Sequence, residues 1–165
     1  KLMESIERTF FDNEGNHLLV ALCFCDDDYK RDTLHVPEEF LDIEIVDIET
    51  TKAYVDKPIH YGVFFKMSTW LMEQFEAHKD AIFTFICSID ELETNHPEDL
   101  PQTYRWNLFD RLYQRYSDKA RVNVQDVLIG PEGFRSFGRA FYRDCHAPII
   151  HIVTAYLEEK QMLYT

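Results

Sequence analysis

The chain has 165 residues, and its 30 Asp and Glu outnumber its 17 Lys and Arg to give a formal net charge of −13. This length predicts one domain that buries roughly 70% of its unfolded surface, and the 45% hydrophobic content excludes intrinsic disorder. The apolar runs are too short to span a membrane, and the first residues lack the hydrophobic region of a signal peptide, so we expect a cytoplasmic protein.

The first third of the chain predicts three successive strands. Residues 4–12 and 17–25 read as two strands joined by the turn sequence NEGN. The segment DDDYKRD is expected to be a polar loop. Residues 40–49 alternate apolar and acidic side chains until the phase shifts at Val46, which indicates a half-exposed strand with a bulge or an end there. The three strands predict an antiparallel meander with one acidic, solvent-facing side.

A helix and a buried strand are predicted next. The helix begins either at the Asp56-Lys57-Pro58 cap or later, near Phe64, because the β-prone residues between them leave its start ambiguous. Residues 81–89, AIFTFICSI, form a continuous apolar run that predicts a central strand. The helix is recognised by apolar residues that recur every four positions: Ile59, Val63, Met67, Leu71 and Phe75.

Four elements are predicted in the last part of the chain. Residues 102–116 show the clearest helical periodicity, and residues 121–129 read as a strand that ends in the turn GPEG. A last helix begins at Pro148, with an apolar stripe through Ile149, Ile152, Val153 and Tyr156. With residues 134–144 as a further strand, the order βββ-α-β-α-ββ-α predicts a single α+β domain. In it, a mostly antiparallel sheet carries about three helices on one face.

Residues 134–144, FRSFGRAFYRD, fit two structures. As a strand they place arginine and aromatic side chains alternately on one face, at Arg135, Phe137, Arg139, Phe141 and Arg143. Helical periodicity fits as well, because the aromatic residues and Cys145 also cluster on a helical wheel. The preceding turn and the short break before the last helix favour a hairpin, and we predict a strand. Its small residues, Ser136, Gly138 and Ala140, would then accept a closely packed helix, and its arginine and phenylalanine face would point outward or meet a further strand or partner.

Charge is unevenly distributed along the chain. Residues 1–100 contain 23 acidic and 8 basic residues, a net of −15, whereas residues 101–165 contain 7 and 9, a net of +2. Seven of those nine basic residues are arginine, whose planar guanidinium favours bidentate pairing with a carboxylate or a phosphate. We therefore expect the arginines of residues 101–165 to pair with carboxylates of the first hundred residues.

A second candidate constellation involves Asp90, Arg105 and Arg111. Arg105 falls on the apolar stripe of the 102–116 helix, where an unpaired buried charge would be costly. Asp90, at the end of the preceding apolar strand, is its expected partner. A structural ion pair is the simpler interpretation, and a ligand clamp is the alternative.

Residues 83–116 also carry a family resemblance. The strand end Ile86-Cys87-x-x-Asp90, followed by a helix with Arg105, Leu108, Phe109 and Arg111, resembles the core of a family of small uncharacterised bacterial proteins. The resemblance extends over roughly residues 64–160 but departs from the family pattern in the length of the loop before the helix and at Trp106 and Tyr113. It implies a compact bacterial domain, suggests that Asp90, Arg105 and Arg111 form one constellation, and implies no reaction.

Metal and cofactor sites are not indicated. The four cysteines have no framework spacing and are expected to be reduced. Cys23 and Cys25 share a strand face and could bind zinc with Cys145 and His146, but their spacing is not typical of a zinc site. Asp26, Asp27 and Asp28 could hold Mg²⁺ with Asp32, but consecutive acids in a loop are more often solvated. Phosphate-loop, dinucleotide-binding and hydrolase motifs are absent from the sequence. We expect no metal and no cofactor.

Three functions remain open at this stage. The first is a small acidic binding protein that engages a basic protein partner, as an immunity protein or an inhibitor would. The second is a single-stranded nucleic-acid-binding module that uses the Arg and Phe face of residues 135–143, which the net charge of −13 disfavours. The third is an enzyme acting on a phosphorylated substrate at Asp90, Arg105 and Arg111, ranked last because the sequence shows no nucleophile. An oligomeric state is not indicated.

Overall fold

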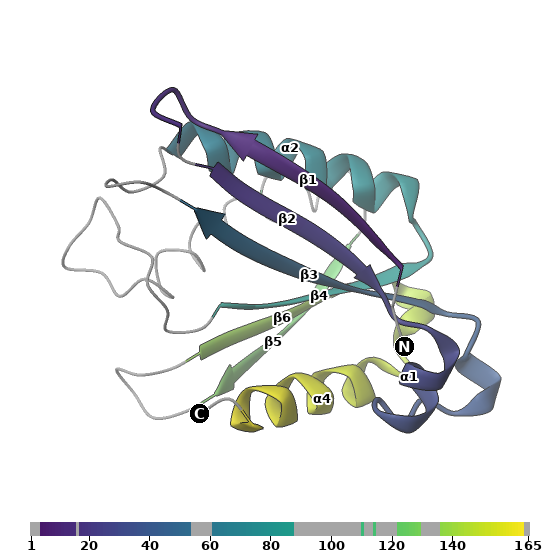
Figure 1. Ribbon diagram of the computed structural model, residues 1–165. Coiled ribbons are helices and arrows are strands. Elements are labelled where there is room, and N and C mark those ends of the chain that lie inside the picture. Colours follow the sequence, from purple (N-terminus) through teal and green to yellow (C-terminus); the bar gives the residue numbers. More distant parts are fainter. Residues whose placement is uncertain are drawn as a thin grey trace.

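The computed structural model describes residues 4–15, 17–53, 61–87, 110, 114, 122–129 and 136–163. They build a six-stranded, mostly antiparallel sheet in the order β1-β2-β3-β4-β6-β5 (Figure 1). The fold is α+β, as predicted. The strands are β1 (Ser5–Phe11), β2 (His17–Phe24), β3 (Glu44–Ala53), β4 (Ala81–Cys87), β5 (Asn123–Ile129) and β6 (Ser136–Tyr142). The helices are α1 (Asp27–Asp32), α2 (Tyr61–Ala77) and α4 (Ile150–Leu163), with short 3-10 turns η1 (Glu38–Phe40) and η2 (Asp144–His146).

The first three strands form the predicted antiparallel meander. Strand β1 pairs with β2 from Ser5 opposite Cys23 to Phe11 opposite His17. Strand β2 pairs in turn with β3, from His17 opposite Ala53 to Phe24 opposite Val46. The β1–β2 turn includes Gly15, whose φ of 87° lies in the left-handed region that glycine adopts without strain.

The centre of the sheet is made by β4, as its continuous apolar sequence predicts. It runs parallel to β3, to which it is connected through the segment containing α2, and antiparallel to β6. Residues 134–144 form a strand over Ser136–Tyr142, and β5 and β6 pair in an antiparallel arrangement as predicted. The 102–116 helix lies almost wholly outside the described residues, of which only Asp110 and Gln114 fall in it, and both are helical.

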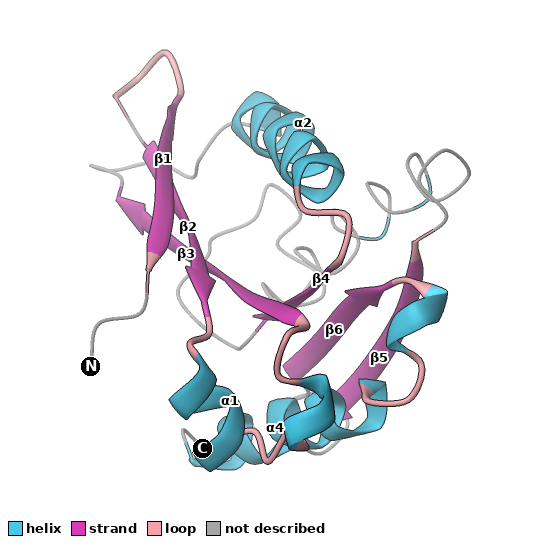
Figure 2. Cartoon of the chain, turned by 90° about the vertical axis from the view of Figure 1, so that its right-hand side faces the viewer, coloured by secondary structure: helices cyan, strands magenta, loops and turns pink. Residues whose placement is uncertain are grey.

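Helices cover both faces of the sheet, so the prediction of helices on one face is wrong. Neighbouring residues of one strand belong to different cores: Ile45 and Val46 on β3 point in opposite directions. One core joins α2, through its predicted stripe of Val63, Met67, Leu71 and Phe75, to Leu18, Val20, Leu22, Val46, Ile48, Phe83 and Phe141. The other joins Ile45, Ile82 and Ala140 to Ile149 and Val153 at the start of α4 and to Leu34, Val36 and Leu41 after α1. Figure 2 shows α2 on one side of the sheet and α1 with α4 on the other.

This second core also corrects two local predictions. The phase shift at Val46 is not a bulge but marks the end of the pairing between β2 and β3, whereas the pairing between β3 and β4 continues through Val46 from Glu44 to Asp47. Instead β3 begins only at Glu44, and Leu41 before it packs into the second core from a turn. The segment DDDYKRD is not a loop: it forms α1, whose N-cap Asp26 accepts a hydrogen bond of 2.7 Å from the Tyr29 backbone N–H.

The final helix packs against the small residues of β6 as predicted. A Cβ on Gly138 would lie 3.6 Å from Leu157 Cδ1 of α4, and Ala140 is fully buried beside Ile149 and Val153. The stripe of α4 also includes the buried Leu157, which the sequence pattern did not single out. Among the described residues, no helix is both long and apolar enough to cross a membrane.

Candidate functional site

The Arg and Phe side chains of β6 do not form an exposed surface. Arg139 is 2% exposed and Phe141 is 6% exposed, because both point to the face of the sheet that α2 covers. Phe141 packs against Phe75 of α2 and Phe85 of β4, with ring centroids 5.2 and 5.6 Å away. The outward Arg and Phe face predicted from the sequence is therefore wrong at these two positions.

Arg139 is instead the centre of an internal ion pair. Its guanidinium binds Asp126, directly opposite on β5, through Nε to Oδ1 at 2.7 Å and Nη2 to Oδ2 at 3.1 Å. Nη2 also donates to Asp110 Oδ1 at 3.1 Å. The expected internal pairing is confirmed for Arg139, but both partners come from residues 101–165 and not from the acidic first hundred residues.

The other predicted positions divide into two groups. Arg143 is half-buried, and its guanidinium donates a hydrogen bond to the Lys79 backbone carbonyl. Phe137 lies on β6 opposite Leu128, and nothing further is described for its side chain. Asp90, Arg105, Arg111 and Arg135 lie outside the described residues, so their proposed constellation stays a prediction.

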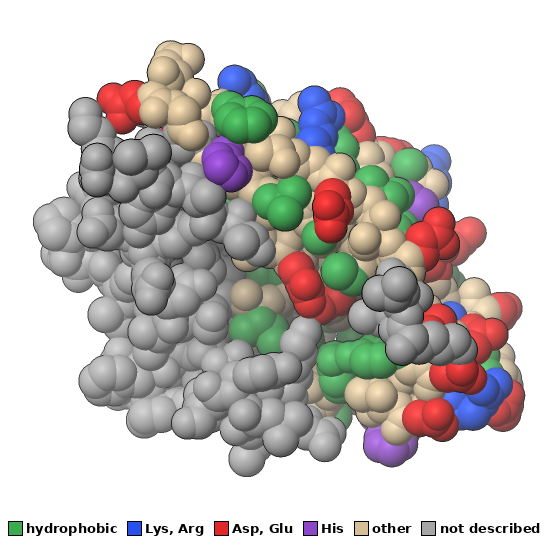
Figure 3. Space-filling model, in the orientation of Figure 1, with side chains coloured by type: hydrophobic (Ala, Val, Ile, Leu, Met, Phe, Trp, Pro, Cys, Tyr) green, Lys and Arg blue, Asp and Glu red, His purple; other side chains and the backbone are tan. Residues whose placement is uncertain are grey.

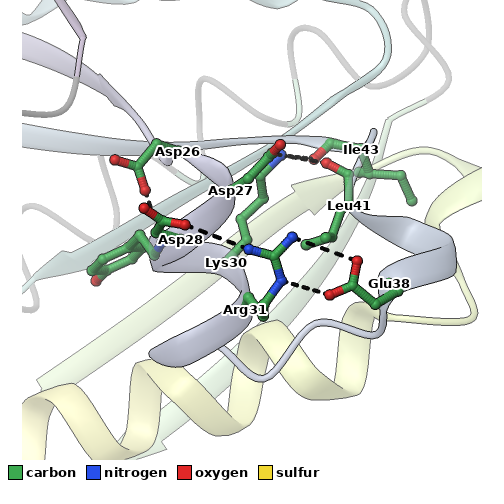
Figure 4. A network of polar contacts seen from close by, with 9 residues as sticks. Asp26, Asp27, Asp28, Lys30, Arg31, Glu38, Leu41 and Ile43 are labelled. Atoms are coloured by element: carbon green, nitrogen blue, oxygen red, sulfur yellow. Dashed lines mark hydrogen bonds and ion pairs between the residues drawn. The ribbon is translucent and has the colours of Figure 1, made fainter.

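Within the described part of the chain, the strongest concentration of charge lies at residues 26–49. This segment contains ten Asp and Glu and only two basic residues, Lys30 and Arg31, a net of −8. It runs from the N-cap of α1 through η1 into β3, on the side of the sheet that carries α4. Both basic side chains are used within the segment (Figure 4).

The Lys30 side chain connects α1 by hydrogen bonds to residues 41–43, which precede β3. The side chain is buried, and its Nζ donates to the carbonyl oxygens of Leu41 at 2.6 Å and Ile43 at 3.0 Å, with Asp27 Oδ1 at 3.4 Å. This is a structural role, because both carbonyls would otherwise lose their hydrogen-bond donor. The ammonium group is therefore hidden from any partner.

Arg31 is held by carboxylates on both sides. Its Nε lies 2.5 Å from Glu38 Oε1, and its Nη1 lies 3.4 Å from Asp28 Oδ1. The hydrogen bond to Glu38 raises the pKa of the guanidinium above its ordinary value. Asp26 caps α1, so the three consecutive aspartates bind atoms of the protein, and within the described part of the chain no group of side chains could hold a metal ion.

Three acids of the same segment have no partner among the described residues. Asp32, Glu39 and Asp42 are exposed and make neither a hydrogen bond through their side chains nor an ion pair. They surround α1 and η1, at the end of the sheet where β2 leads into α1. We call these three residues the α1 acids.

Further acids lie on the adjoining sheet face. Glu49 on β3 and Glu7 on β1 both stand directly opposite Ala21 of β2, so the three form one row across the meander. Both glutamates are exposed, and Asp47 lies two residues away on the same face, where it accepts a hydrogen bond from Thr84 at 3.0 Å. In Figure 3 acidic side chains gather over these strands and around α1.

The sequence located only part of this arrangement. The acidic residues of the 40–49 segment were expected on one solvent-facing side of a strand: Asp42, Glu44, Asp47 and Glu49. Asp42 instead precedes β3. Glu44 points to the opposite face, where its Oε1 lies 3.0 Å from His78 Nδ1. Glu7 was not singled out. Its alternation with Thr9 and Phe11 in the sequence was the available signal, but the strand register was needed to place it opposite Ala21.

His151 on α4 is exposed, whereas His146 is buried. Its Nδ1 accepts a hydrogen bond of 3.0 Å from the Arg143 backbone N–H, and its Nε2 lies 2.9 Å from the Asp80 carbonyl oxygen. A carbonyl oxygen only accepts, so Nε2 carries the proton. Burial lowers the pKa of this imidazole, and the nearby charge of Arg143 lowers it further.

Comparison of the sequence with models of known families gave no match, and no curated protein matches it significantly. The resemblance to the bacterial family with the Ile-Cys-x-x-Asp strand end therefore stays a prediction.

Proposed function

We propose that this protein is a small acidic binding protein of the bacterial cytoplasm that engages a basic protein partner, in the manner of an immunity protein or an inhibitor. One observation carries the proposal. The segment 26–49 has a net charge of −8, and its two basic side chains are held inside the segment by Leu41, Ile43, Asp28 and Glu38. The α1 acids thus remain available to a partner.

Such a surface favours a basic partner for a physical reason. Clustered carboxylates create a negative potential that speeds the diffusional encounter with a cationic protein. The Debye length is about 8 Å at physiological salt, so added salt weakens this attraction strongly. The same field repels nucleic acid. The nucleic-acid hypothesis also loses two of its residues, because Arg139 and Phe141 are buried.

The test is co-purification from the native host at about 50 and 500 mM NaCl, with two charge-reversal variants beside the wild type. The first reverses the α1 acids (Asp32→Lys, Glu39→Lys, Asp42→Lys). The matched control reverses three exposed acids elsewhere: Glu14→Lys, Glu73→Lys and Glu76→Lys. Each set changes the net charge from −13 to −7, since each reversal adds two positive charges.

We expect the wild type and the control to retain a stoichiometric basic protein at low salt and to lose it at high salt. The α1 variant should not retain this protein at either salt concentration. If both variants lose the partner equally, the interaction depends on net charge alone and not on the α1 acids. The absence of any basic partner at either salt concentration would overturn the proposal.

A further inference from the structure

Within the described part of the chain, no helix lies over one half of a sheet face. On the side that carries α4, β4 and β6 are covered, and Ile82, Thr84 and Ala140 are buried. Across β1, β2 and residues 47–49 of β3, the described side chains on the same face are only half-buried or exposed, and no described helix lies over them in Figure 1 or Figure 2. The opposite side of these strands packs into the core that contains α2, through Phe10, Leu18, Val20, Leu22, Val46 and Ile48. The uncovered half is thus a layer that the described part of the chain leaves unfilled.

The strand register gives this face a simple pattern. Its middle column, on β2, is formed by Leu19, Ala21 and Cys23, all half-buried. On β1 the column is flanked by Thr9 opposite Leu19 and by Glu7 opposite Ala21. On β3 it is flanked by Glu49 opposite Ala21 and by Asp47 opposite Cys23. An apolar column therefore runs between two polar columns, with carboxylates on both sides of Ala21.

At one end the face becomes more apolar. Phe11 of β1 is 58% exposed, and its ring packs against His17, its partner on β2, with ring centroids 5.4 Å apart. An aromatic side chain this exposed beside half-buried Leu19 extends the apolar column toward the β1–β2 turn. Together, Glu7, Phe11, Leu19, Ala21, Asp47 and Glu49 define what we call the meander face.

The dimensions of the meander face match one α-helix. Neighbouring strands lie about 4.8 Å apart, so β1 and β3 are separated by about 10 Å. A helix with its side chains is about 10–12 Å across. A helix lying along β2 would place an apolar stripe on Leu19 and Ala21, and basic side chains on its two flanks would reach Glu7 on one side and Glu49 and Asp47 on the other.

We infer that the meander face docks an amphipathic α-helix of the protein partner, with an apolar stripe flanked on both sides by Lys or Arg. The inference rests on the proposed function and adds the secondary structure of the partner and its place on the sheet. Charge selects this occupant over a second copy of the chain, because two copies of the meander face would bring glutamates against glutamates. The helix would complete the layer that α4 begins over β4 and β6.

The test uses a displayed library of random 18-residue peptides selected against the whole chain at about 100 mM NaCl. We expect enriched peptides with apolar residues at positions i, i+3, i+4 and i+7 and with Lys or Arg beside that stripe. Labelled copies of these peptides are then titrated by fluorescence anisotropy. Glu7→Lys with Glu49→Lys should weaken binding at least about 10-fold, the equivalent of about 1.4 kcal/mol.

The matched control is Glu73→Lys with Glu76→Lys, which makes the same charge change on exposed positions of α2, on the other side of the sheet. It should weaken binding less than about 3-fold, since exposed charges beyond a Debye length are largely screened. Leu19→Gln tests the apolar column and should also weaken binding. Circular dichroism melts of each variant confirm that the fold is retained.

Several results would overturn the inference. Enriched peptides with alternating apolar residues would point to strand addition at the β1 edge, and equal weakening by both double variants would show attraction by net charge only. Concentration-dependent self-association abolished by Glu7→Lys would identify a second copy as the occupant, and no enrichment would remove the site. If the host partner depends on the α1 acids while the peptides ignore Glu7 and Glu49, the helix site fails and the proposed function stands. If neither a basic partner nor a peptide binds, both fail.

Discussion

Arg139 carries a positive charge although it is almost completely buried. The carboxylates of Asp126 and Asp110 offset the free-energy cost of burying this charge. The bidentate contact to Asp126 spans β5 and β6 directly, while Asp110 adds one further hydrogen bond. Asp126 is partly exposed, with 39% of its side chain accessible, so it can be solvated without Arg139, whereas Arg139 cannot be solvated without its partners. Removing Asp126 is therefore expected to destabilise the fold more than removing Arg139.

Asp126→Asn should lower the free energy of unfolding by about 2 kcal/mol, because it leaves the buried guanidinium with Asp110 as its only carboxylate partner in the described structure. Urea denaturation followed by circular dichroism measures the loss. Adding Arg139→Met should restore part of the stability, since it removes the charge that needs a partner. A loss below about 0.5 kcal/mol, the usual range for a surface substitution, would contradict this account.

His146 couples stability to pH. Its pKa is lowered in the folded protein, mainly by burial, so the unfolded chain binds this proton more readily. Its stabilising contribution is complete above the unfolded pKa of about 6.5 and falls as the pH drops from there toward the folded pKa. The loss amounts to at most about 1.4 kcal/mol per pH unit for one proton.

His146→Gln should reduce this pH dependence between about pH 6.5 and 5. Glutamine can keep the hydrogen bond to the Asp80 carbonyl but cannot titrate. His151→Gln is the matched substitution, because His151 is exposed on α4. Urea denaturation at several pH values gives the slopes, and an unchanged slope in His146→Gln would show that other groups cause the acid sensitivity.

At the scale of elements, the packing of β6 on α4 depends on small side chains. A Cβ at Gly138 would lie 3.6 Å from Leu157 Cδ1 and 3.7 Å from Val127 Cβ, which is ordinary van der Waals contact. Gly138→Ala should therefore be neutral or stabilise by about 0.5 kcal/mol, as the unfolded chain loses entropy. Gly138→Leu should destabilise by about 1–3 kcal/mol through overpacking. Urea denaturation checks both values, and equal stability of the two variants would contradict the close approach of α4.

Most of these elements were predictable because their periodicity is strong. The turn sequence NEGN between β1 and β2, the four-residue repeat of α2 and the continuous apolar run of β4 each predict elements that the structure contains. The short helix α1 was missed because consecutive aspartates are typical of solvated loops. Here Asp26 caps the helix, acids occupy its first turn and Lys30 and Arg31 occupy its last, which together form a helix signal.

The candidate site was less predictable because it depends on pairing between strands. Arg139 meets Asp126, and Glu7 and Glu49 flank Ala21, only through registers that the sequence does not specify. The two-sided cover of the sheet was missed for a related reason. The parallel connection from β3 to β4 places α2 on one face, whereas α4 reaches the other face after β6.

For the whole molecule, the acids concentrated at one end of the sheet act against stability. Asp32, Glu39 and Asp42 have no partner among the described residues, and Asp32 is the last residue of α1, where the helix dipole disfavours an acid. Repulsion within a chain of net charge −13 destabilises the compact state. A surface retained at such a cost is expected where binding requires it.

The triple variant of the α1 acids should therefore melt above the wild type at about 10 mM NaCl, and the difference should shrink at about 500 mM, where the Debye length falls to a few ångströms. The control that reverses Glu14, Glu73 and Glu76 reaches the same net charge of −7 and should melt below the α1 variant, since it also removes the ion pair between Glu76 Oε2 and Lys79 Nζ, which lie 3.7 Å apart. Differential scanning calorimetry at both salt concentrations measures the three melting temperatures.

A difference that persists at high salt would mean that the substitutions act through helix propensity or packing. Equal gains in both variants would mean that net charge matters and its clustering around α1 does not. If only the α1 variant gains melting temperature, and only at low salt, then the carboxylates that lower the stability of the fold are the same ones that form the proposed binding surface.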